Sequence, residues 1–334
     1  MTRLATALLA LAVSSPCLAE SRPEWAFFVP HAAAPTAPTQ SAAPAVEGRA
    51  VEGRAVEAQA VDVLNPPDWY PDEHPPMPAV VAHGSPPEAD RKAPLLPCAL
   101  CHLPNGAGHV ESASLAGLPA EYIVRQFAGF RSGERHINVG GARAERLLTV
   151  LKSGYTDEQV RAAAGYFSAL APRRWISVRE AKWVPKTVVD PDSLMRTALD
   201  DHGTELLGNR IVELPESESG LRERNAHSGF IAYVPKGSLA AGKRLVAAAD
   251  DRILACTACH GKALNGLGGI PPLAGRPPTY LVRQLWNYQS GERRGGLAAP
   301  MQVVAARLRV DEMLAIAAYL ASLPPGRSDQ EPKL

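Results

Sequence analysis

The feature that most constrains this chain is a pentapeptide, Cys-x-x-Cys-His, that occurs twice. The first copy occupies residues 98–102 and the second occupies residues 256–260, an offset of 158 positions. The same offset relates the residues after each copy, because segments 98–135 and 256–293 align without a gap and share 16 of their 38 residues. A duplication of this length predicts that the two halves of the chain share one fold.

Cys-x-x-Cys followed directly by His is the pattern by which a chain binds haem covalently. Two thiols one helical turn apart can each bond a vinyl group of one porphyrin, and the next imidazole reaches the iron. A thioredoxin-like pair would need a βαβ context, and a zinc site would need further ligands. Two disulfides would leave both histidines unexplained. We therefore predict two haem c groups, whose attachment and axial residues are Cys98, Cys101 and His102, and Cys256, Cys259 and His260.

The two halves differ in the residue that is available as the second axial ligand of the iron. Met301 lies between the second motif and the last helical segment, where a thioether would complete the His/Met pair that suits electron transfer. Core packing is the alternative role for this methionine. The corresponding position in the first half is Leu147 or Leu148, and neither can ligate iron. His136 and Met195 are possible replacements, and a five-coordinate iron is the third option.

Arg125 and Arg283 occupy equivalent positions in the duplication. A guanidinium matches a carboxylate in a bidentate way, so we expect these two side chains to contact haem propionates. A surface ion pair is the alternative role for each of them.

Hydrophobic periodicity and helix-boundary residues predict a mainly α fold. Two short apolar runs between the halves read as strands within an otherwise irregular connector. The expected helices are 79–82, 120–130, 156–170, 239–249, 279–289 and 311–323, and the expected strands are 211–214 and 230–234.

The N-terminus and the charge of the chain bear on its location and partners. Arg3 and the apolar run 4–13 are typical of a secretory signal, which predicts a periplasmic protein. The sequence after residue 13 contains no run of 18 consecutive apolar residues, so we expect no membrane span after signal cleavage. The 35 basic residues balance the 34 acidic ones, which argues against a nucleic-acid partner.

These motifs resemble class I cytochromes c, and their tandem arrangement is similar to that of the dihaem cytochromes of bacterial periplasms. The resemblance covers residues 70–172 and 237–325 and rests on both haem motifs and on the Leu-Ala-Gly…Tyr…Arg-Gln…Gly-Glu-Arg block. It implies a small helical fold around each haem. The expected organisation is a signal peptide (1–19), a disordered Ala/Pro-rich tether (20–68), cytochrome c domain 1 (69–172), a connector (173–236), cytochrome c domain 2 (237–326) and a tail (327–334).

The resemblance implies an electron carrier rather than an enzyme. Such a protein relays electrons from a dehydrogenase to an oxidase or another cytochrome, and its redox chemistry belongs to the cofactor. Two alternatives stay open: a peroxidase-like haem enzyme with an open first haem, and the cytochrome subunit of a quinoprotein dehydrogenase. The sequence leaves the oligomeric state open.

Overall fold

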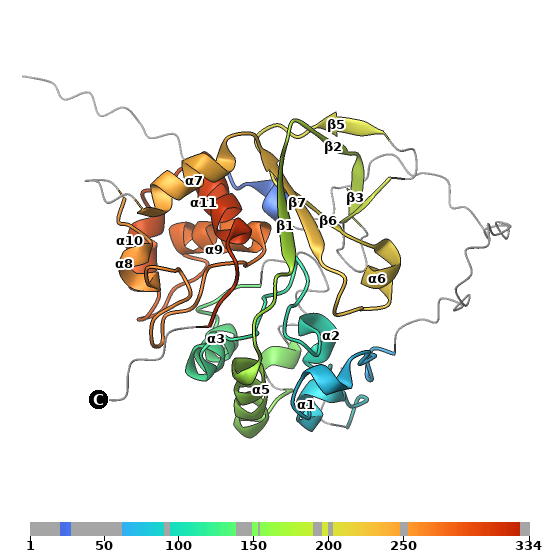
Figure 1. Cartoon of the computed structure of the whole chain (residues 1–334). Helices are drawn as coiled ribbons and strands as arrows, with labels where there is room; N and C mark the ends of the chain where they lie inside the picture. The colour runs from blue at the N-terminus through green and yellow to red at the C-terminus, as the bar shows by residue number, and fades with distance from the viewer. Residues whose placement is uncertain are drawn as a thin grey trace, which may run out of the picture.

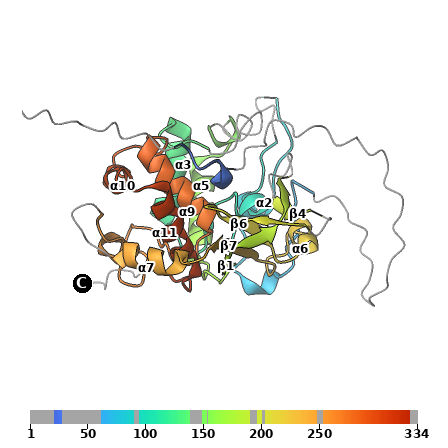
Figure 2. The same cartoon turned by 90° about the horizontal axis from the view of Figure 1, so that it is seen from above.

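Helices form the two haem-motif halves and short strands lie between them (Figures 1 and 2). The computed structural model describes residues 21–27, 62–89, 94–137, 149–152, 154–189, 196–199, 203–247 and 253–327. The first half contains α1 (Ala79–Ala82), α2 (Ala99–His102), α3 (Ala120–Ser132) and α5 (Asp157–Ala169). The second contains α7 (Ser238–Ala247), α8 (Thr257–His260), α9 (Pro278–Ser290), α10 (Ala299–Ala305) and α11 (Val310–Ser322). Two single-turn 3-10 helices, η1 (Glu24–Ala26) and η2 (Pro71–Glu73), precede them.

Helices α3 and α9 are equivalent in the duplication and end in the same way. Gly133 and Gly291 follow them with φ angles of 76° and 79°. This left-handed conformation suits glycine and stops a helix. The predicted helices 120–130 and 279–289 are therefore confirmed.

The last helix of the first half begins with a capping box, in which side-chain and backbone groups bond reciprocally, and the last helix of the second half has only one of the two bonds. In α5 the Thr156 hydroxyl accepts from the Gln159 backbone N–H, and the Gln159 side chain accepts from that of Thr156, as expected. In α11, however, Glu312 accepts from the Arg309 N–H, and Asp311 lies inside the first turn rather than at the cap.

Helices α7 and α11 pack closely because α7 carries a glycine at the contact. A Cβ atom added at Gly242 would overlap the backbone carbonyl of Ala315. On α11 the residues beside Gly242 are Ala315 and Tyr319, and Met313 and Ala317 of the same helix are fully buried. Both helices contribute buried residues to the larger hydrophobic core.

The connector between the halves is more ordered than the sequence indicated. A three-stranded sheet of order β1-β7-β6 comprises Ile176–Ala181, Phe230–Pro235 and Val212–Pro215, with β1 parallel and β6 antiparallel to β7. The predicted strands 211–214 and 230–234 correspond to β6 and β7, whereas β1 was not predicted. Two further antiparallel pairs join β2 (Trp183–Pro185) to β5 (Thr204–Leu206) and β3 (Thr187–Val189) to β4 (Arg196–Ala198). A short helix, α6 (Glu218–Arg222), links β6 to β7.

Residues 21–27 depart from the predicted disordered tether. They form η1, which packs beside α9, and Ala26 and Phe27 are buried in the core shared by the sheet and the second half (Figure 1). Burial of two apolar side chains explains why this segment is ordered. Residues 28–61 lie outside the described residues.

Among the described helices, none has the length and apolar composition that crossing a membrane requires.

Candidate haem sites

Each Cys-x-x-Cys-His motif folds into a single helical turn. The His102 N–H donates to the Cys98 carbonyl, and the His260 N–H donates to the Cys256 carbonyl, both over 3.0 Å. This turn places the two thiols of each motif on neighbouring positions of one helical face, beside the imidazole. None of the four motif cysteines takes part in a disulfide within the described residues. The local geometry is therefore that of a covalent haem attachment site in both halves.

The two motif imidazoles are oriented identically. Nδ1 of His102 donates to the Ala113 carbonyl and Nδ1 of His260 donates to the Pro271 carbonyl, each over 2.8 Å. A carbonyl can only accept, so the proton is on Nδ1 and the lone pair of Nε2 is left for a metal. Burial lowers the pKa of both rings, which keeps the imidazoles neutral. These are the properties of a proximal iron ligand.

The loop after each motif has positive φ angles at the same three places, and at two of them one loop has a leucine where the other has a glycine. At these two places the angles are 60° at Leu103 and 70° at Gly106 in the first loop, and 79° at Gly261 and 58° at Leu264 in the second. Each loop thus uses one leucine where glycine is easier. A non-glycine residue in this region costs about 1–3 kcal/mol and persists only where the surroundings fix it. Both leucine side chains are buried, which anchors the loops.

The two halves meet through residues that the duplication repeats. Arg293 donates to the Tyr122 hydroxyl over 2.7 Å, and Arg135 donates to the Tyr280 hydroxyl over 3.2 Å. The 158-residue offset converts one of these contacts into the other. The arrangement is that of an interface with approximate two-fold symmetry, in which residue i contacts j and j contacts i.

Two glutamines complete this arrangement. Gln126 accepts from both Arg135 and Arg293, and Gln284 accepts from the same two arginines, at 2.6–3.2 Å. We call the six residues the crossed network: Tyr122, Gln126, Arg135, Tyr280, Gln284 and Arg293. Sequence analysis missed the role of this network, although its residues are among the identities between the copies. A repeat shows that positions are shared, but it does not show which copy each side chain faces.

The interface between the halves carries buried positive charge. Arg135, Arg276 and Arg293 are buried, and within the described residues they donate only to hydroxyl, amide and carbonyl groups. Burial alone raises the pKa of Tyr280, but the neighbouring arginines outweigh burial and lower it. Buried cations call for anionic partners. Haem propionates are anions of the required kind, so the structure fits a haem on either side of this interface.

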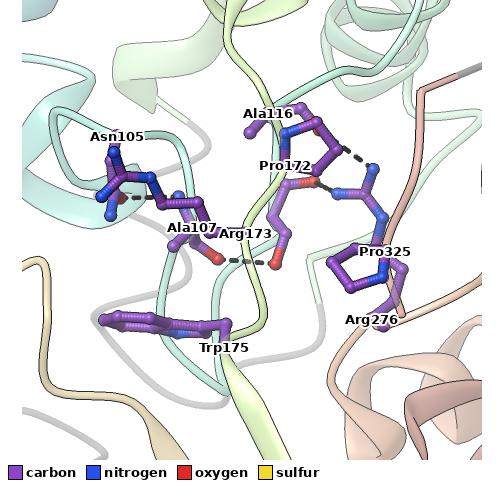
Figure 3. Close-up of a pocket in the computed structure, with 10 residues that line it drawn as sticks. Asn105, Ala107, Ala116, Pro172, Arg173, Trp175, Arg276 and Pro325 are labelled. Atoms are coloured by element: carbon purple, nitrogen blue, oxygen red, sulfur yellow. Dashed lines mark hydrogen bonds between the residues drawn. The ribbon is translucent and has the colours of Figure 1, made fainter. Parts of the chain in front are cut away.

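Arg276 also lines a small cavity of about 20 Å³ between the halves (Figure 3). Its guanidinium donates to the carbonyls of Ser114 (2.5 Å) and Ala116 (3.1 Å). Arg276 Nε and Trp175 Nε1 are buried donors that meet no acceptor among the described residues. The cavity is large enough for one water molecule.

The two arginines predicted to contact propionates bridge the halves through backbone carbonyls. Arg283 is buried and donates to Ala26 (2.8 Å) and Val110 (2.7 Å), and Arg125 donates to Gly269 over 3.4 Å. A guanidinium has five N–H groups, so these contacts leave room for further acceptors. The propionate assignment therefore stays a prediction.

The candidate second axial ligands have different surroundings. Met301 is half-buried in the first turn of α10, which packs against α9. His136 is exposed, and its backbone N–H donates to the Glu292 carbonyl beside the crossed network. Met195 lies outside the described residues, as do Leu147 and Leu148. The axial roles of these residues stay predictions.

Comparison with known protein families matches residues 239–324 to the family described as Cytochrome c. Cytochrome c-554(548) of Halomonas halodenitrificans is 43% identical over 77 residues, which are 23% of this chain and 93% of that protein. This chain belongs to the cytochrome c family. The cytochrome is also similar to the thiosulfate dehydrogenase electron acceptor of Thiomonas intermedia, with 27% identity over 233 residues, 68% of this chain and 78% of that one.

Among solved structures, the cytochrome is similar to thiosulfate dehydrogenase TsdBA from Marichromatium purpuratum in its "as isolated" form. The two are 28% identical with a TM-score of 0.44. The match covers 69% of this chain and 37% of that longer chain.

Proposed function

We propose that this electron-transfer cytochrome carries two haem c groups and relays electrons in the periplasm from a dehydrogenase to an oxidase or another cytochrome. The observation that carries the proposal is the equality of the two motif sites. His260 is buried and His102 is partly buried, the pKa of both rings is lowered, and both rings hold Nδ1 to a carbonyl at 2.8 Å. A chain that needed one haem would have no reason to keep this arrangement twice.

Each haem supplies one-electron exchange at its iron when it is bound. The chain orients the axial imidazoles through the Ala113 and Pro271 carbonyls. The crossed network joins the two halves directly, which favours a short path for electrons between their cofactors. Its buried arginines are cations of the kind that pair with propionates, so their proposed role is to hold the haems in place.

We propose two cytochrome c domains, 69–172 and 237–326, joined by the connector 173–236. Met301 is the proposed second ligand in the second domain, because it follows the site in the order that the resemblance implies. His136, Met195 or an open coordination position completes the first. Different ligands predict different potentials, with the His/Met site the higher of the two.

A dehydrogenase is the proposed electron donor, and the similarity to a thiosulfate dehydrogenase electron acceptor makes thiosulfate dehydrogenase the first donor to test. The match covers 233 residues, or 68% of this chain, so it includes parts of both halves. This coverage supports a role for both halves in electron transfer.

The first experiment counts haems in protein matured in a periplasm. Pyridine haemochrome absorbance and intact mass should give two haems per chain. Replacing both Cys98 and Cys101 by Ala, or both Cys256 and Cys259 by Ala, should give one. The oxidised protein is then mixed with thiosulfate dehydrogenase and thiosulfate, and haem reduction is followed by absorbance. One haem per wild-type chain, or rapid cyanide binding with peroxide turnover, would contradict the proposal.

A further inference from the structure

A buried carboxyl group lies where the connector meets both halves. Glu213 is on β6 and is 3% exposed, and its backbone pairs with Ala232 of β7 in the sheet. The Thr279 hydroxyl of α9 donates to one carboxyl oxygen, and the other oxygen, Oε1, has no hydrogen-bond partner among the described residues. Burial raises the pKa of Glu213 to about 7. The group therefore changes its protonation near neutral pH.

The charged neighbours of Glu213 come from three different elements. Arg283 of α9 favours the carboxylate, whereas Glu111, in the loop after the first haem motif, disfavours it. His109 of that loop lies 3.3 Å from Glu111, between Nδ1 and Oε1. Arg196 of β4 is the other cation that interacts with Glu213. Because the pKa of Glu213 is about 7, one further charge nearby would change its protonation near neutral pH.

The loop that contains His109 and Glu111 also forms hydrogen bonds with the first motif histidine. The Gly108 N–H donates to the His102 carbonyl over 2.9 Å, and the Ala113 carbonyl accepts from His102 Nδ1. His109 and Glu111 lie between these two contacts along the chain. Charges buried together in a protein interior interact far more strongly than charges in water. Glu111 acts electrostatically on both the His102 ring and the Glu213 carboxyl group, so this loop is the proposed route by which a change of charge at the first haem reaches Glu213.

We propose that Glu213 is a redox-linked proton site of the first haem, an inference that rests on the proposed function. When the ferrous iron gives one electron to an acceptor protein, the Glu213 carboxyl group releases one proton to solvent, and its carboxylate offsets the added positive charge. Reduction reverses both transfers, since one electron enters from the donor and one proton enters from water. Electron transfer through this cytochrome would then be coupled to proton uptake and release, unlike electron transfer through a carrier without such a site.

The test measures the potentials of both haems from about pH 5 to pH 9, two pH units on either side of the Glu213 pKa. Spectroelectrochemistry of the wild-type dihaem protein should show one potential that falls as pH rises and one that stays level. A tenfold change in the redox equilibrium constant, which is 59 mV for one electron, corresponds to a pKa difference of one unit between the two redox states. Glu213→Gln should remove the slope. Glu216→Gln is the matched control, because Glu216 lies three residues away and is less buried.

A second variant and a second measurement separate a proton site from a merely structural role. Thr279→Val retains the carboxyl group but removes the donor that lowers its pKa, so the slope should move to higher pH. The oxidised-minus-reduced infrared spectrum should show loss of a protonated carboxyl band in the wild type but not in Glu213→Gln. A wild-type slope that persists in Glu213→Gln, or level potentials in a protein with two bound haems, overturns the inference. Fewer than two haems per chain overturns the proposed function instead.

Discussion

Replacing Tyr122 by Phe removes one oxygen atom from the crossed network and tests whether the halves are joined as described. Arg293 of the other half donates to that oxygen over 2.7 Å. A hydrogen bond to a charged group contributes about 1.5–3 kcal/mol to stability. Because the bond joins the two halves, Tyr122 and Arg293 should be energetically coupled by an amount in this range.

A double-mutant cycle isolates this coupling energy. The cycle compares wild type, Tyr122→Phe, Arg293→Met and the double variant, using urea unfolding of the oxidised protein followed by circular dichroism. Arg293→Met also removes a donor from Gln126 and from Gln284, but this cost is common to both arms of the cycle and cancels. The equivalent cycle for Tyr280 and Arg135 should give a smaller coupling, since that bond measures 3.2 Å.

The control cycle pairs Tyr122 with Arg131, at the other end of the same helix. Arg131 binds Asp157 and the Tyr155 carbonyl and has no part in the crossed network. Its effect should add to that of Tyr122→Phe within about 0.5 kcal/mol. If the Tyr122–Arg293 cycle is equally additive, the two halves do not meet through these residues, and the crossed network is refuted.

Four further outcomes are expected. Glu213 has its pKa raised from 4.5 to about 7, so the folded state keeps a proton that the unfolded state loses in this window; wild-type stability should fall by about 3 kcal/mol from pH 4.5 to pH 7 in urea unfolding, and an equal fall in Glu213→Gln would contradict this. Gly242→Ala should destabilise the fold by about 1–3 kcal/mol because its Cβ meets backbone, whereas Gly165→Ala, with open space around it in α5, should stabilise by about 0.5–1 kcal/mol; thermal unfolding of both variants tests the α7–α11 contact. Thr156→Ala should cost about 1 kcal/mol through loss of the capping box, measured in the same way, and a neutral result would mean that the cap is dispensable. Met301→Ala should lower the higher of two haem potentials in a redox titration, and unchanged potentials would assign Met301 to packing.

Local patterns in the sequence were sufficient for the longer helices, whereas the short helices α6 and α10 were not predicted. The glycines after α3 and α9 and the threonine before α5 act on their own neighbours, so the predicted boundaries agree with the structure. The cap of α11 differs because Glu312 lies in the first turn and bonds back to Arg309, which places the start of the helix one residue before Asp311.

Contacts between distant segments could not be predicted in the same way. Strand β1 pairs in parallel with β7, more than fifty positions away, so neither strand determines the pairing by itself. The order of η1 depends on a core built by the opposite end of the chain, although Trp25 and Phe27 could have indicated an apolar anchor. Likewise, the predicted attachment residues follow from spacing alone, whereas the crossed network exists only because two copies face each other.

The near-symmetry of the crossed network has a consequence for how such a chain can diverge. In a pair of separate identical subunits, every substitution at the contact appears on both sides at once. Here both sides are encoded by one chain, so each can change alone. Position 276 is Arg and reaches across to the first half, while its counterpart at position 118 is Leu. An interface between two copies within one chain therefore has two sides that can be tuned independently, and with them the surroundings of each motif histidine.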